Sequence, residues 1–117
     1  MRPESIALGQ VLLDHHRHNC IRPDGSLPPR DACLITYGVL CSQAGVPHLT
    51  QKPGLFLSEI ADWCVKNEWP PINALAVNEQ SRMPGDNYDV APGCHLFDWP
   101  QEVDRCIAWR QYPATIP

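Results

Sequence analysis

Apolar residues recur at helical spacing in four separate stretches of the chain. Between Ser5 and about Asn19 they fall at i, i+3, i+4 and i+7, which predicts an amphipathic helix whose inward stripe is Leu8, Val11, Leu12 and His15. Further helices are predicted from Tyr37 to about Ala44, from about Pro53 to Glu68, and after Asp98.

Residues at the ends of these stretches support the helix boundaries. Thr36 is a good N-cap, and Gly45 suits the position just beyond a helix C-terminus. Pro53 suits a first turn, and the run Trp69-Pro70-Pro71 stops the same helix. Asp98 can cap the last helix. The expected inward side chains are Phe56, Ile60, Trp63 and Cys64 in the third helix and Val103, Cys106 and Ile107 in the last.

The segments between the helices are of two kinds. Ile72 to Val77 is nearly all apolar, which predicts a strand covered on both faces. Residues 20–31 and 78–93 are rich in glycine and proline, which predicts a loop and a long turn-rich wing. With no repeat or linker, residues 1–117 are expected to form a single α/β (mainly α) domain, a winged helix-turn-helix-like fold with N- and C-terminal helices.

Composition narrows the class of protein. Of 117 residues, 44% are hydrophobic and 19% charged, which is typical of a globular domain. No apolar run approaches the roughly 20 residues of a membrane span, and the N-terminus lacks the layout of a signal peptide. We therefore expect a soluble, cytoplasmic protein with no membrane contact. None of the six cysteines lies in a C-x-x-C pair, so buried free thiols are expected rather than disulfides.

The charge pattern argues against a dedicated nucleic-acid binder. The net charge is −4, and an acidic stretch near the C-terminus comprises Asp86, Asp89, Asp98, Glu102 and Asp104. The candidate recognition helix is also net negative, because residues 50–69 carry Lys52 and Lys66 against Glu59, Asp62 and Glu68. A positive cleft gathered from Arg17, Arg22, Arg30 and Lys52 would favour nucleic acid.

Short motifs between residues 34 and 90 resemble the DNA-binding domain of alkylguanine-DNA alkyltransferases. Ile35-Thr36-Tyr37-Gly38 is similar to the start of the family's helix-turn-helix. Residues 71–78, Pro-Ile-Asn-Ala-Leu-Ala-Val-Asn, fall where the family carries its active-site segment ending in Val-Asn, and Pro84-Gly85 matches its wing. A group of uncharacterised bacterial proteins is more similar, with Thr-Tyr-Gly, Pro-Pro-Leu-x-Ala-Leu-Val-Val-Asn and Pro-Gly segments. The resemblance implies a winged-helix fold.

The same alignment excludes alkyl transfer. It places Asn73 at the position of the nucleophilic cysteine and Ala74 at that of its histidine. Alkyl transfer needs a thiolate with an adjacent base, which a carboxamide and a methyl group do not supply. No Gly-rich phosphate loop, paired carboxylates or H-E-x-x-H helix is present either, so we expect a protein that is not an enzyme.

Two functions remain open. The first is recognition of DNA or a modified nucleotide, in which Tyr37 matches the tyrosine of the catalytically inactive alkyltransferase-like proteins; the expected contact residues are Thr36, Tyr37, Lys52, Asn73, Asn78 and Arg82. The alternative is a protein-interaction module, a regulator or inhibitor, that uses the acidic face. For Tyr37 the competing interpretation is a half-buried packing residue, and for the asparagines it is turn capping.

No cofactor or metal is expected. His15, His18 and Cys20 invite a metal site, since His15 and His18 would share a helix face. A structural zinc site needs four ligands, however, and no spacing specifies the remaining ones. His15 also lies on the apolar stripe, which favours a core histidine.

Overall fold

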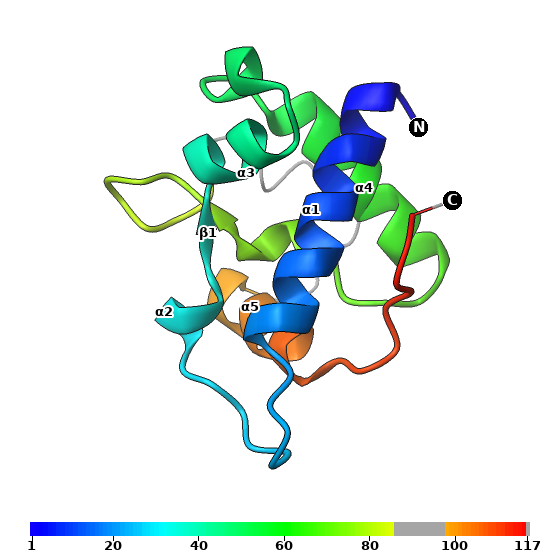
Figure 1. Cartoon of the computed structure of the whole chain (residues 1–117), viewed down its shortest axis with the longest axis vertical. Helices are drawn as coiled ribbons and strands as arrows, with labels where there is room; N and C mark the ends of the chain where they lie inside the picture. The colour runs from blue at the N-terminus through cyan, green and yellow to red at the C-terminus, as the bar shows by residue number, and fades with distance from the viewer. Residues whose placement is uncertain (86–97, 117) are drawn as a thin grey trace.

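The computed structural model describes residues 1–85 and 98–116 (Figure 1). In chain order, its elements are α1 (Pro3–Asn19), α2 (Arg30–Cys33), β1 (Ile35–Thr36), α3 (Tyr37–Gln43), η1 (Pro47–Leu49), α4 (Gly54–Lys66), η2 (Ile72–Leu75), β2 (Ala76–Val77) and α5 (Trp99–Ala108), where η1 and η2 are 3₁₀ helices. The described part is mainly helical, in agreement with the predicted mainly α class. The short helix α2 was not predicted, and its first two residues belong to the segment 20–31 that was expected to be a loop.

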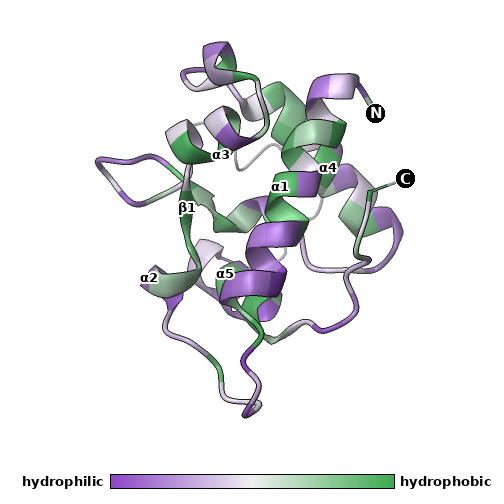
Figure 2. Ribbon diagram, viewed as in Figure 1, coloured by the Kyte–Doolittle hydropathy of each residue, from purple (hydrophilic) through white to green (hydrophobic). Residues whose placement is uncertain are grey.

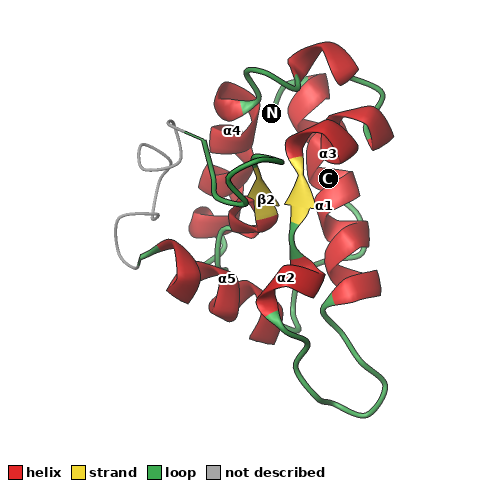
Figure 3. Ribbon diagram, turned by 90° about the vertical axis from the view of Figure 1, so that its left-hand side faces the viewer, coloured by secondary structure: helices red, strands yellow, loops and turns green. Residues whose placement is uncertain are grey.

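A two-stranded parallel sheet lies in the middle of the molecule. Ile35 pairs with Ala76 and Thr36 with Val77. In Figure 3, α1 and α3 lie on the side of the sheet formed by β1, and α4 lies on the side formed by β2. Helix α1 packs against α4, α3 and η2, and α5 packs against η2 and α2. The largest fully buried apolar side chains are Leu8, Leu12, Leu13, Leu40, Ile60, Ile72, Leu75, Val77 and Val103.

The prediction that Ile72 to Val77 form a strand is wrong for most of the segment, whereas the prediction that they are buried is confirmed. Only Ala76 and Val77 are extended, and the first four residues form η2. A longer strand has no partner, because the parallel register would place residues 72–75 opposite residues 31–34, and Arg30–Cys33 form α2. The carbonyl of Ala74 instead accepts a hydrogen bond from Trp99 Nε1 at 2.8 Å. All six residues are nonetheless buried, as expected.

Helices α1 and α4 present slightly different faces from those predicted. The buried face of α4 consists of Leu57, Ile60, Ala61 and Cys64, and that of α1 includes Leu8, Leu12, Leu13 and His16. Phe56 and Trp63 are only half-buried, because the face of α4 that packs on α1 is rotated toward Leu57. Similarly His16, not His15, is the core histidine. Figure 2 shows hydrophobic residues along much of α4 and hydrophilic ones toward the C-terminal end of α1.

The predicted helix ends agree with the structure. Thr36 Oγ1 accepts a hydrogen bond from the Val39 amide, and Asp98 forms a capping box with Gln101 at the start of α5. After α3, Gly45 has φ = 76° and the Val46 amide donates to the Cys41 carbonyl, which is a Schellman motif. Helix α4 ends with the same motif, but there Glu68 takes the left-handed position, at φ = 60°.

The C-terminal segment is fastened to α1 by one side chain. Gln10 donates from Nε2 to the Ala114 carbonyl and accepts at Oε1 from the Ile116 amide, both at 3.0 Å. A Cβ placed on Gly9 would come within 2.6 Å of Ile116 Cδ1, so a glycine lets this segment lie close to the helix.

The described cysteines, Cys20, Cys33, Cys41, Cys64 and Cys106, are buried thiols, as expected. No helix in residues 1–85 and 98–116 has both the length and the apolar character needed to cross a membrane. Of the predicted wing, residues 78–85 are described and form a turn in which the Asn78 amide donates to the Met83 carbonyl. Residues 86–93 lie outside the described part.

Glu68 and Gly45 allow a paired test of backbone strain. The left-handed conformation costs a residue with a Cβ about 1–2 kcal/mol, whereas glycine adds about 0.5–1 kcal/mol of unfolded-state entropy. Glu68→Gly is therefore expected to raise the free energy of unfolding by about 0.5–1 kcal/mol, and Gly45→Ala to lower it by about 1 kcal/mol. Urea denaturation measures both. Equal effects of the same sign would contradict this interpretation.

His16 predicts a loss of stability in mild acid. Its Nε2 donates to the Cys106 carbonyl at 2.7 Å, and burial lowers its pKa, with smaller contributions from Arg110 and His15. Because the folded pKa lies below the unfolded value of about 6.5, the stabilisation is complete above that pH and is lost as the pH falls below it. Burial likewise lowers the pKa of His15.

His16→Gln keeps a donor near the Cys106 carbonyl and removes the titrating group. The slope of unfolding free energy against pH below about 6.5 is expected to decrease by up to about 1.4 kcal/mol per pH unit. Urea midpoints between pH 7.5 and 5 provide the measurement. A slope identical to that of the unchanged chain would rule out His16 as the source.

Candidate functional site

The described residues bound a cleft of about 700 Å³ between α3, the start of α4, η2 and the turn at 78–85. This size is typical of pockets that hold small ligands. Its lining residues are Tyr37, Thr50, Gln51, Lys52, Pro53, Gly54, Leu55, Phe56, Leu57, Ser58, Asn73, Asn78 and Gly85. The cleft exists because α3 and α4 are joined by ten residues rather than a tight turn, and each packs against α1.

Tyr37 forms one wall of the cleft as the first residue of α3. The cap at Thr36 fixes the start of this helix and therefore the position of the tyrosine. The Tyr37 hydroxyl accepts a hydrogen bond from the Gly85 amide at 2.6 Å, which ties the turn at 78–85 to α3. Burial raises the pKa of Tyr37, so the phenol is neutral and keeps its own proton available for donation.

Asn73 is the most unusual residue of the cleft. It is 4% exposed, and its Oδ1 is buried without a hydrogen-bond partner among the described residues. Leaving a buried acceptor unpaired costs about 1–3 kcal/mol. Two other atoms in the described part share this condition, Glu102 Oε1 and Trp109 Nε1, but neither residue lines the cleft. An unpaired polar atom at a cleft is the arrangement expected where a ligand completes the hydrogen bond.

The rim of the cleft is polar and exposed. Lys52 lies at the entrance, immediately before α4, and forms no ion pair with a described residue. Asn78 Oδ1 accepts from the Gln80 amide at 2.9 Å, so this asparagine caps a turn while also lining the cleft. Phe56 supplies a second aromatic wall, and the Arg2 guanidinium lies 5.6 Å from the centre of its ring.

Four of the six contact residues expected from the sequence meet at this cleft: Tyr37, Lys52, Asn73 and Asn78. Thr36 is instead engaged as the cap of α3. Arg82 has φ = 57° within the turn and donates to the Asp31 carbonyl at 3.3 Å, away from the cleft. The sequence did not predict the remaining cleft residues, which are Thr50, Gln51, residues 53–58 and Gly85. The available signal was a helix start, Lys52-Pro53-Gly54, that lacks a capping side chain.

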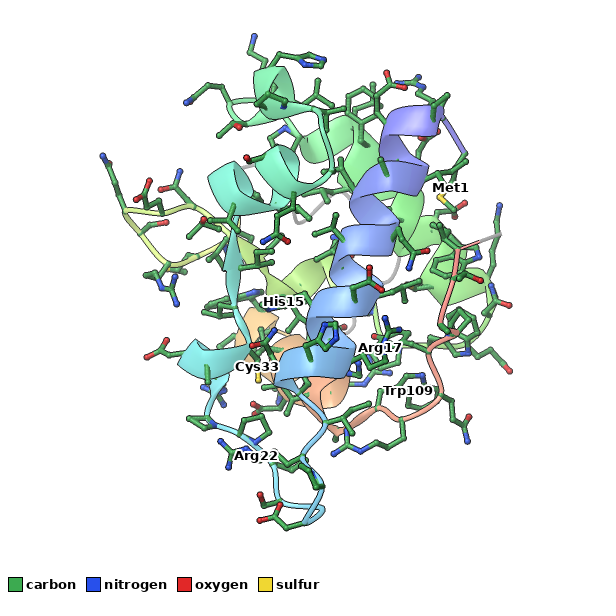
Figure 4. All side chains as sticks on the ribbon, viewed as in Figure 1. Met1, His15, Arg17, Arg22, Cys33 and Trp109 are labelled. Carbon is green, nitrogen blue, oxygen red and sulfur yellow. The ribbon has the colours of Figure 1, made fainter. Side chains whose placement is uncertain are left out.

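The cations are not gathered into one positive surface. Five of the nine Lys and Arg residues pair with carboxylates, in Arg2–Glu59, Arg17–Asp14, Arg30–Asp104, Lys66–Asp62 and Arg105–Glu102. Arg17 and Arg22 lie at the C-terminal end of α1, opposite Met1 (Figure 4). Helix α4 begins near the other end, where Arg2 meets Glu59. Arg17, Arg22 and Arg30 therefore do not join Lys52 in a positive cleft. The positive surface that would favour binding of a nucleic-acid duplex is not formed by these residues.

The described part of the acidic stretch is largely engaged within the molecule. Asp98 caps α5, Asp104 pairs with Arg30 at 2.7 Å, and Glu102 is fully buried. Burial raises the pKa of Glu102, while Arg105 acts in the opposite direction. Asp86 and Asp89 lie outside the described residues.

The candidate metal residues make other contacts. His15 donates from Nε2 to the Cys33 carbonyl at 2.7 Å (Figure 4). This hydrogen bond links α1 to α2 and gives the His15 side chain a structural role. Within residues 1–85 and 98–116, no three His, Cys, Asp or Glu side chains are grouped so that they could hold a metal ion. None of the described cysteines lines the cleft. Burial raises the pKa of Cys41, which lies on the same helix as Tyr37.

Tyr37→Phe removes the acceptor for the Gly85 amide and keeps the aromatic wall. A neutral hydrogen bond contributes about 1 kcal/mol, so exchange of the Gly85 amide proton is expected to accelerate on the order of fivefold. Amide hydrogen exchange followed by NMR checks this, with the Val39 amide at the Thr36 cap as the internal control. If exchange at Gly85 is unchanged, Tyr37 does not hold the turn.

Neither protein-family models, nor curated proteins, nor solved structures show a significant match to this chain. The resemblance to alkylguanine-DNA alkyltransferases therefore stays a prediction from short motifs.

Proposed function

We propose that this chain recognises a nucleotide, free or in DNA, by taking its base into the cleft between α3 and α4, on a winged-helix-like scaffold and without alkyl transfer. The observation that carries the proposal is the buried Asn73, whose Oδ1 has no hydrogen-bond partner among the described residues, in a cleft lined by two aromatic residues. A carboxamide offers one acceptor and up to two donors in a plane, which matches the hydrogen-bonding edge of a nucleobase.

The walls suit a flat, partly apolar ligand. Tyr37 and Phe56 both line the cleft, and proteins bind unstacked bases by stacking them on aromatic side chains. Asn73 would then read the edge of the base, because its Oδ1 requires an N–H donor. The cleft volume of about 700 Å³ is sufficient for a base with its sugar.

The same residues argue against chemistry at the base. Asn73 has no nucleophilic atom, and the described cleft-lining residues include no cysteine, histidine or carboxylate that could act as a nucleophile or general base. The function that fits is binding. The protein-interaction alternative has less support, because Glu102 is buried and Asp104 is neutralised by Arg30.

The proposal predicts opposite effects of Asn73→Leu on stability and on binding. Leucine has nearly the same shape and removes the unpaired buried acceptor, so the free energy of unfolding is expected to rise by about 1 kcal/mol. Base binding is expected to be lost. Urea denaturation gives the first quantity. NMR titration of the ¹⁵N-labelled full chain with the four deoxynucleosides, their methylated forms and a short single-stranded oligonucleotide gives the second.

Asn67→Leu is the matched control, because Asn67 is exposed at the far end of α4 and donates to the Trp63 carbonyl. Its binding is expected to equal that of the unchanged chain. If none of the bases perturbs the resonances of Tyr37 or Asn73 in the unchanged chain, the proposed function is wrong. A large loss of stability in Asn73→Leu would show that the carboxamide is structural.

A further inference from the structure

We propose that the start of α4 is a phosphate subsite of the same cleft, so that the ligand is a free nucleoside monophosphate rather than a base within duplex DNA. This inference rests on the proposed function for the base and adds a second, separate contact. Pro53, the N-cap residue of α4, has no side-chain acceptor, and the first turn carries no acidic residue. Helices α1 and α2 also lack a capping side chain, but each has an acidic residue in its first turn, whereas α3 and α5 are capped.

The backbone donors at this terminus are therefore free. The Phe56 and Leu57 amides donate to the Pro53 carbonyl, whereas the Gly54 and Leu55 amides have no acceptor among the described residues. Both of these residues line the cleft. Free amides at a helix N-terminus, with the positive end of the helix dipole, form a ready binding site for an oxyanion.

Two further features point to a ligand at this place. Lys52 lines the same cleft, is exposed, and forms no ion pair with a carboxylate of the described residues. Asn73, 4% exposed with an unpaired Oδ1, lines the same cleft and independently requires a donor from a bound molecule. The cleft is thus lined by a lysine, two free backbone amides, two aromatic side chains and a carboxamide. A nucleoside monophosphate has groups that complement them, an anion, a sugar and a base.

The charge distribution selects a free nucleotide over a duplex. A duplex brings phosphates along its whole contact surface, and its affinity depends on neutralising several of them. Beyond the entrance, the exposed side of α4 carries Glu59 and Asp62, each already paired within the protein. Lys52 is the cleft-lining cation in the described chain, so the site neutralises one phosphate group and not a row of them.

The test compares ligands that differ only in phosphate. The ¹⁵N-labelled full chain is titrated with a nucleoside 5′-monophosphate, the corresponding nucleoside, and inorganic phosphate. A charge-assisted contact is expected to make the monophosphate bind about tenfold more tightly than the nucleoside. Inorganic phosphate alone is expected to shift the Gly54 and Leu55 amide resonances. Equal affinity of nucleoside and monophosphate would overturn the phosphate subsite while leaving the base site in place.

Lys52→Ala and Lys66→Ala form a matched pair of variants on either side of α4. Lys52→Ala is expected to remove most of the tenfold advantage of the monophosphate over the nucleoside. Lys66 lies in the last turn and pairs with Asp62, so Lys66→Ala is expected to change neither affinity. An equal loss in both variants would reveal a non-specific charge effect and overturn the subsite.

The remaining outcomes separate this inference from the proposed function. If inorganic phosphate shifts Gly54 and Leu55 but no nucleoside binds, the phosphate subsite stands and the base site falls. If a short DNA duplex competes more strongly than the monophosphate at equal phosphate concentration, the choice of a free nucleotide is wrong.

Discussion

The structure depends on one constraint, that the polar backbone groups of a fully buried segment must find partners. The segment from Pro70 to Val77 runs through the interior, where an unpaired carbonyl or amide is costly. Side chains from the C-terminal part supply several of the partners. The Tyr112 hydroxyl donates to the Pro70 carbonyl, Cys106 Sγ to that of Pro71, and Trp99 Nε1 to that of Ala74. Helix α5 and the segment after it are positioned by these contacts.

The need to pair these buried backbone groups also places the residues of the cleft next to one another. The last two residues of the segment pair with β1, and β1 leads directly into the cap and first residue of α3. Tyr37 and Asn73 therefore reach one cleft because the strands that adjoin them are hydrogen-bonded to each other. Asn73 itself lies on η2 and lines the cleft, and its buried Oδ1 has no hydrogen-bond partner among the described residues.

The helices of this molecule differ in what stabilises their N-termini. Helices α3 and α5 have capping side chains, from Thr36 and Asp98. Helices α1 and α2 have no cap but carry an acidic residue in the first turn, whereas α4 has neither. The uncapped start coincides with the cleft, as does the unpaired Asn73. Caps and paired polar groups stabilise a fold, and sites that bind ligands commonly depart from both rules. This coincidence of two unsatisfied features in one place is why the cleft supports a functional proposal.

Local chemistry in the sequence was sufficient for the helix boundaries. The cap at Thr36, the glycine after α3, the stop at Trp69-Pro70-Pro71 and the capping box at Asp98 each act within a few residues, so they can be read without the fold. Burial of residues 72–77 followed from their apolar character alone. Of the candidate site, Tyr37 and Asn73 were identified from motif resemblance, although the motifs did not show what lies between them.

Only the tertiary structure decided the features that depend on distant partners. Residues 72–75 became a 3₁₀ helix because β1 offers two residues to pair with and α5 takes the carbonyl of Ala74. The buried faces of α1 and α4 were set by how these helices pack on each other, which one-dimensional spacing defines only to within a neighbouring residue. The dispersal of the arginines and the unpaired state of Asn73 likewise follow from long-range packing, since hydrogen bonds and ion pairs between distant residues leave no local pattern in the chain.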